Sequence, residues 1–149
     1  MEIKYPELNE GCENYFVLNE AHRSQKPYYG YYLSDHSVGE NVPPLRKSPD
    51  WKGHAWYRFL RPAGTKMLQR PPCEAGRCNR GHCGTQTQGW MNGTLPQVYG
   101  QTLDAVVCFV NVNGICDYNE PIKVRNCGHF FIYELKDVFK LDMAYCATE

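Results

Sequence analysis

The sequence predicts a mainly β fold: a single disulfide-stapled domain of short antiparallel strands, with long loops and little helix. Eight cysteines in 149 residues, together with thirteen glycines and ten prolines, are typical of a loop-rich extracellular domain. From residue 55 onward, short segments rich in β-branched and aromatic residues alternate with turn signals. No long apolar pattern of helical period occurs before residue 134.

The first fifty residues are polar and show little periodicity. The aromatic cluster of residues 28–32 is flanked by Pro27 and interrupted by Gly30, which favours a loop or an edge strand over a helix. Pro43 and Pro44 exclude a helix and a central strand around them.

The rest of the chain predicts strands separated by turns. Asn113-Gly114 is a strong hairpin signal directly after an apolar, β-branched segment. Residues 71–89 contain three cysteines and two prolines, and we expect a stapled loop there. The expected strands are residues 55–60, 65–68, 105–112, 122–125 and 130–135. No internal repeat or long linker divides the chain, so one domain is expected.

Charge and hydropathy argue against a nucleic-acid-binding protein and against a membrane-spanning one. Lysine plus arginine equals aspartate plus glutamate at 16 each, so the basic excess of a nucleic-acid-binding protein is missing. The longest apolar run, residues 105–110, is far shorter than the roughly 20 residues of a membrane helix. No apolar segment of a signal peptide follows Met1, so a secreted chain would be a mature fragment or a domain taken from a longer protein.

The sequence contains no catalytic pattern and only a weak metal pattern. Cys73, Cys78 and Cys83 follow one another at regular spacing, with His82 beside the last, and such a cluster could hold zinc. Disulfides in a glycine-rich loop explain the same spacing, and we favour them. The histidines are scattered and no serine lies in a nucleophile elbow. We therefore expect no catalytic residue, no metal and no cofactor, and the chain is not expected to be an enzyme.

Asn92-Gly93-Thr94 is an acceptor triplet for N-glycosylation. The preceding residues, Trp90 and Met91, suggest a strand that runs into a surface turn at Asn92. Asn92 is therefore the candidate glycosylation site.

A second functional hypothesis is a lectin-like domain that binds carbohydrate or another partner through aromatic side chains, because Tyr and Trp are favoured at such contacts. The candidate contact residues are Tyr28, Tyr29, Tyr31 and Tyr32, with Trp51, Trp56 and Trp90 as neighbours. The alternative for Trp56, Tyr57, Phe59 and Trp90 is a place in the core of a small β domain, which we favour for them.

Several motifs resemble a known family in order and spacing. They are Trp56-Tyr57-Arg58-Phe59, Cys83-Gly84-Thr85, Trp90-Met91-Asn92-Gly93-Thr94-Leu95-Pro96, Val107-Cys108-Phe109, Val124-Arg125-Asn126-Cys127, Phe131-Ile132-Tyr133-Glu134-Leu135 and Tyr145-Cys146. Together they resemble the eight-cysteine extracellular module of uromodulin and the pancreatic secretory-granule membrane glycoprotein, which also occurs in invertebrate mosaic proteins. The resemblance covers residues 12–146, so residues 1–11 would be an N-terminal extension and 147–149 a C-terminal tail.

This resemblance implies a non-enzymatic, extracellular module of a larger secreted or membrane-anchored glycoprotein. Extracellular proteins, or microbial adhesins and their glycans, are the implied partners. In the mammalian namesakes, bacterial fimbrial adhesins bind an N-glycan on this module. Glu134 takes the place of that glycan-bearing asparagine here, so the adhesin site is not carried over. Asn92 does match a second sequon of the family.

The resemblance also implies a disulfide pattern. It pairs Cys12 with Cys127, Cys83 with Cys146, and Cys108 with Cys116. Cys73 and Cys78 remain as a fourth pair, and exchange with Cys116 stays open. Two further cysteines of the family, which pair with each other in uromodulin, are both missing from this chain.

Overall fold

The computed structural model describes residues 11–24, 32–37, 45–73, 81–111, 113–140 and 142–149. This part of the chain confirms a mainly β domain, with a single turn of 3-10 helix, η1 (Ala21–Arg23), as its only helical element. The strands in chain order are β1 (Phe16–Leu18), β2 (Tyr32–Ser34), β3 (Leu45–Lys47), β4 (Ala55–Phe59), β5 (Lys66–Met67), β6 (Thr87–Asn92), β7 (Thr102–Asn111), β8 (Gly114–Asn126), β9 (Phe131–Leu135), β10 (Met143–Tyr145) and β11 (Ala147–Thr148).

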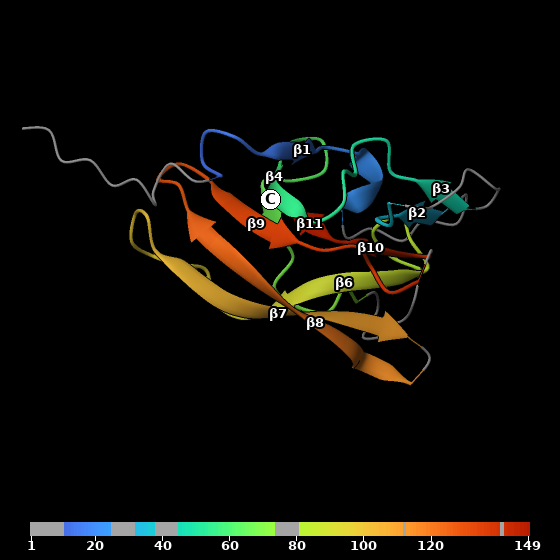
Figure 1. Cartoon of the computed structure of the whole chain (residues 1–149). Coiled ribbons are helices and arrows are strands. Elements are labelled where there is room, and N and C mark those ends of the chain that lie inside the picture. The colour runs from blue at the N-terminus through green and yellow to red at the C-terminus, as the bar shows by residue number, and fades with distance from the viewer. Residues whose placement is uncertain (1–10, 25–31, 38–44, 74–80, 112, 141) are drawn as a thin grey trace, which may run out of the picture.

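The main sheet has seven strands in the order β1-β4-β9-β8-β7-β6-β10 (Figure 1). Its five central strands are antiparallel to one another, as expected. The expectation of antiparallel pairing is wrong at both edges, where β1 lies parallel to β4 and β10 parallel to β6. The small β2–β3 pair is parallel as well. Parallel neighbours need long connections, which the polar, loop-rich segments of this sequence supply.

The β7–β8 hairpin is much longer than the expected strands. The turn at Asn113-Gly114 is confirmed, and β8 continues without a break from Gly114 to Asn126. The sequence does not predict the first half of β8 as a strand, because only one face of it is partly covered and its residues are mostly polar.

Residues 107–110 of strand β7 are buried on both faces, and their side chains alternate between two apolar clusters. Val107 and Phe109 belong to the main core, which also holds Tyr57, Phe59 and Tyr133. Cys108 and Val110 point to the other face, into a smaller cluster completed by Leu68, Cys83, Trp90 and Cys146. The sheet is therefore covered on both sides where β6 and β7 meet.

The last residues of the chain are part of this fold. Ala147 and Thr148 form β11, which pairs antiparallel with β5. Ala147 is fully buried in the main core, and the amide of Met67 on β5 donates to the Tyr133 hydroxyl at 3.0 Å. Residues 147–148 thus contribute a strand, whereas the resemblance ends at residue 146 and implies a tail.

Candidate functional site

The structure contains three disulfides among the described residues, and they are the pairs that the resemblance implies. Cys12 bonds Cys127 at the N-terminal end of the domain, with the two Cα atoms 5.7 Å apart. Cys83 bonds Cys146 across the second apolar cluster, and both are fully buried. Cys108 bonds Cys116 within the β7–β8 hairpin.

The fourth pair lies partly outside the described residues. Cys73 is exposed and disulfide-bonded, and Cys78 is not described. Cys83 forms a disulfide with Cys146, so its sulfur is not a thiolate that could bind zinc. Only two of the three cysteines proposed for a zinc site then remain. The described residues include no group of three or more side chains suited to a metal ion.

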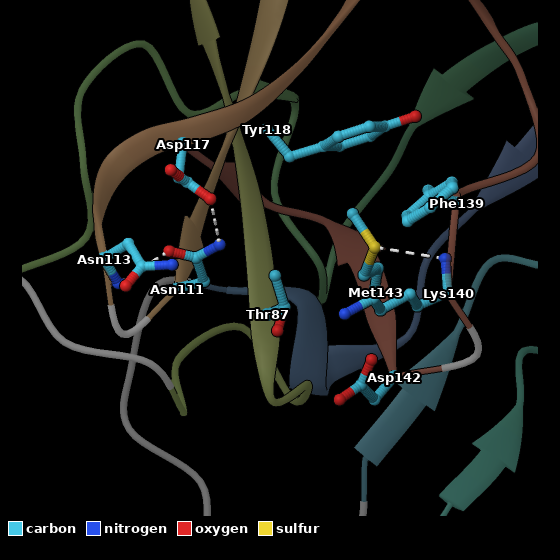
Figure 2. A pocket seen from close by; sticks show the side chains of 9 residues that line it. All are labelled: Thr87, Asn111, Asn113, Asp117, Tyr118, Phe139, Lys140, Asp142 and Met143. Carbon is cyan, nitrogen blue, oxygen red and sulfur yellow. Dashed lines mark hydrogen bonds between the residues drawn. The ribbon is translucent and has the colours of Figure 1, made fainter.

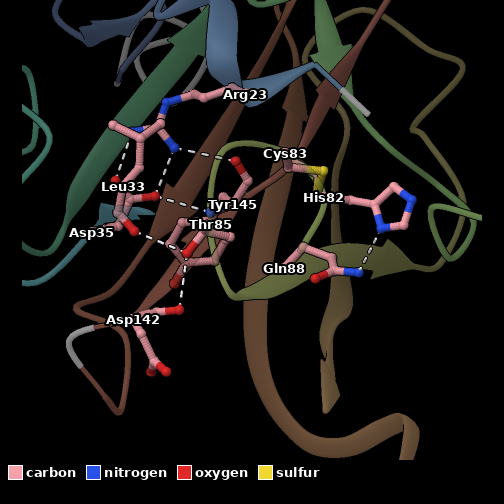
Figure 3. Close-up of a disulfide and its surroundings, with 10 residues drawn as sticks. Arg23, Leu33, Asp35, His82, Cys83, Thr85, Gln88, Asp142 and Tyr145 are labelled. Carbon is pink, nitrogen blue, oxygen red and sulfur yellow. Dashed lines mark hydrogen bonds and ion pairs between the residues drawn. A yellow bond between two sulfur atoms is a disulfide. The ribbon is translucent and has the colours of Figure 1, made fainter. Parts of the chain in front are cut away.

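The Cys83-Gly84-Thr85 motif holds the disulfide against the N-terminal half of the chain (Figure 3). Gly84 has a φ of +68°, and a Cβ atom there would lie 2.7 Å from the carbonyl oxygen of His22. Only glycine allows this close approach. The Thr85 hydroxyl lies 2.9 Å from the carbonyl oxygens of both Leu33 and Asp142. The motif therefore joins three separate segments at one point.

A buried ion cluster, which sequence reasoning missed, lies beside this disulfide (Figure 3). Arg23 of η1 is fully buried and donates two hydrogen bonds to the carboxylate of Asp35, at 2.7 and 2.6 Å. It also donates to Glu20 at 2.8 Å, to the Ser48 hydroxyl at 3.0 Å and to the carbonyl oxygen of Tyr145 at 3.1 Å. Asp35 in turn accepts from the amide of Tyr145 at 2.9 Å. The cluster thus fastens the N-terminal segments to strand β10.

The electrostatics of this cluster favour the charged forms of Arg23 and Glu20, whereas complete burial raises the pKa of the Asp35 carboxyl. Burial opposes the charge of Arg23, but the carboxylates of Asp35 and Glu20 outweigh it and raise the pKa of the guanidinium. Burial likewise opposes the charge of Glu20, and the charge and hydrogen bonds of Arg23 outweigh it and lower the pKa of that carboxyl. Arg23 therefore has to stay paired, because an isolated charge in this position would be costly.

Asn92 lies at the end of β6, with its side chain exposed. Strand β6 is well anchored, since Met91 is fully buried and Trp90 is 7% exposed. Gly93 and Thr94, the other two residues of the sequon, are exposed as well. The sequence contains no second Asn-x-Ser/Thr triplet.

The proposed aromatic contact surface is not assembled by the described residues. Tyr28, Tyr29 and Tyr31 lie outside them, and only the backbone of Tyr32 is described, in β2. Trp51 and Trp90 are buried, so neither can stack on a sugar. Trp56 is half-buried, and the Arg125 guanidinium covers its ring at 4.6 Å.

A groove of about 280 Å³ opens at the turn end of the β7–β8 hairpin, near Asn111 and Asn113 (Figure 2). The residues that line it are Thr87, Asn111, Asn113, Asp117, Tyr118, Phe139, Lys140, Asp142 and Met143. In Figure 2, the side chains of Asn111, Asn113 and Asp117 lie on one side, opposite those of Tyr118, Phe139 and Met143. No local sequence pattern predicts this groove, because it combines residues of the β7–β8 hairpin with residues 139–140 and 142–143.

Comparison with known proteins identifies the family. The family model of the uromodulin-like domain matches residues 57–147, which is more than half of the chain. The chain belongs to the uromodulin-like family. The uromodulin-like domain is accordingly an extracellular, cysteine-rich module, as the resemblance implied.

Curated relatives agree with this assignment. The domain is 26% identical to the pancreatic secretory granule membrane major glycoprotein GP2 of the dog over 91% of its length. It is 28% identical to mouse uromodulin and 30% identical to rat uromodulin, again over 91% of its length. The aligned region spans 23% of the dog glycoprotein and 18% of each uromodulin, so these relatives are much longer proteins. Within the described residues, the domain has no helix of the length and hydropathy that a membrane span requires.

Proposed function

We propose that this uromodulin-like domain is a non-enzymatic module of a larger extracellular glycoprotein, and that it displays its loops and an N-glycan on Asn92 to partners. Residues 12–146 form the module in this proposal. The observation that carries it is the exposed sequon at the end of β6, a strand that pairs with both β7 and β10. The partners are extracellular proteins or microbial adhesins.

The rigidity of the strand around Asn92 supports a role in display. Asn92 is the last residue of β6, directly after the buried Met91, and pairs with Val106 on β7. The neighbouring Cys108–Cys116 bridge ties β7 to β8. A glycan attached to Asn92 would therefore leave the protein from a fixed point at the end of the sheet.

The strand that carries the adhesin-bound glycan in the mammalian namesakes has a different surface in this chain. Glu134 stands in that strand, half-buried, with one carboxylate oxygen 3.6 Å from Nε2 of His54. It cannot be glycosylated, so the proposal assigns any glycan-dependent recognition to Asn92.

Expression in a secretory cell line tests the glycan. We expect the chain to carry one N-glycan, which a peptide N-glycosidase removes with a single shift in mass. Asn92→Gln and Thr94→Ala should each abolish this shift, because both destroy the acceptor triplet.

Asn113→Gln is the matched control, since Asn113 is also an exposed asparagine followed by glycine, but without a threonine. It should leave the shift unchanged. A wild-type chain that is secreted in folded form without a glycan on Asn92 would contradict the proposal.

A further inference from the structure

The groove at the end of the β7–β8 hairpin has the two kinds of wall that carbohydrate recognition requires. On one side, the rings of Tyr118 and Phe139 stack with their centroids 4.9 Å apart and an angle of 26° between their planes. Phe139 is 62% exposed although its neighbour Val138 is buried. The buried Val138 anchors the chain next to Phe139, and the exposed Phe139 ring is available for contact with an apolar ligand face.

The opposite wall is made of planar polar groups. The side-chain nitrogen of Asn111 donates to the carboxylate of Asp117 at 2.8 Å, and the side-chain oxygen of Asn111 accepts from the backbone amide of Asn113 at 2.8 Å. These contacts fix the orientation of donors and acceptors at the rim of the groove. Fixed amide and carboxylate groups suit hydroxyl groups, which both donate and accept.

The charge of the groove disfavours acidic ligands. Its lining includes two carboxylates, of Asp117 and Asp142, and one cation, Lys140. A sialylated or sulfated glycan would meet a net negative surface, so the ligand should be neutral.

Strand β10, the edge of the main sheet next to the groove, also disfavours an extended peptide as the ligand. On β10, the carbonyl oxygen of Met143 accepts from the amide of Asp35 at 3.0 Å, and both backbone polar groups of Tyr145 are bonded to Asp35 and Arg23. A peptide could not add a strand to this edge, because its backbone hydrogen bonds are already made.

We propose that this groove binds a neutral sugar residue, with one face of the ring against Phe139 and its hydroxyls on the side of Asn111 and Asp117. The groove volume is just below the range of small-ligand pockets, which fits one or two sugar units of a longer glycan. Binding at this groove does not depend on glycosylation of Asn92.

The test is a glycan array of neutral, sialylated and sulfated oligosaccharides, probed with the disulfide-bonded Asn92→Gln chain so that its own glycan does not compete. Ligand-observed NMR titration with the best neutral glycan then measures the affinity. We expect saturable binding to neutral glycans, and an affinity loss of about tenfold or more for Phe139→Ala. Asp117→Ala should weaken binding as well.

Tyr99→Ala is the control for a generic aromatic effect, because Tyr99 is 59% exposed and does not line this groove. It should bind like the parent chain, and all variants should keep the parent's melting temperature. The proposal is overturned if no neutral glycan binds saturably, if only acidic glycans bind, or if Phe139→Ala binds with unchanged affinity.

Discussion

Replacing Arg23 with leucine is expected to lower the free energy of unfolding by about 3–5 kcal/mol, because it leaves two carboxylates without their cation in a buried position. Asp35 would lose both hydrogen bonds from the guanidinium, and Glu20 would lose its ion pair. Strand β10 would lose the bond between Arg23 and the carbonyl oxygen of Tyr145. Urea denaturation of the oxidised protein measures the change.

The exposed ion pair between Arg61 and Glu149 provides the control. These side chains are 75% and 58% exposed, so Arg61→Ala should leave the free energy of unfolding nearly unchanged. Arg23→Lys should lie between the two, since lysine keeps the charge but cannot make the two parallel bonds to Asp35. Equal stabilities of Arg23→Leu and Arg61→Ala would contradict the role of the cluster.

Removal of the Cys12–Cys127 disulfide should destabilise the domain more than removal of Cys108–Cys116. The first bridge spans 115 residues and the second only 8. Loop-closure entropy then gives about 5 kcal/mol for the long loop and about 2.5 kcal/mol for the short one. For a domain of this size, the difference of about 2.5 kcal/mol corresponds to about 5–10 °C in melting temperature.

Double serine variants are the best probes, because a single Cys→Ser change leaves a thiol that can pair wrongly. Cys12→Ser/Cys127→Ser is compared with Cys108→Ser/Cys116→Ser by thermal melting. Among single variants, Cys12→Ser should unfold more readily than Cys73→Ser, whose cysteine is exposed. If both double variants melt at the same temperature, the ranking by loop length is wrong.

Local signals in the sequence were sufficient for the strands with the strongest patterns. Asn113-Gly114 predicts its hairpin because a tight turn imposes strict backbone demands. Within Trp56-Tyr57-Arg58-Phe59, residues alternate between two sides of β4, and Tyr57 and Phe59 are fully buried as expected. The disulfide pairs came from the family resemblance, because spacing alone allows about 105 combinations.

Features that depend on distant partners could not be predicted in this way. Arg23 and Tyr145 are 122 residues apart, and nothing in the polar sequence around Arg23 indicates that it is buried. Strands β1 and β10 have three residues each, too few for a visible alternation. The two walls of the groove, at Asn111 and Phe139, meet because the sheet places β6 between β7, which carries Asn111, and β10, which follows Phe139.

The intact mass of the purified chain tests most directly whether this is an oxidised, extracellular domain held by disulfides. The protein, secreted from cells and treated with an alkylating agent without reductant, should incorporate no label. Full reduction should add eight hydrogens, as expected for four disulfides made from the eight cysteines. Alkylation of all eight cysteines in the native, folded protein would contradict the account.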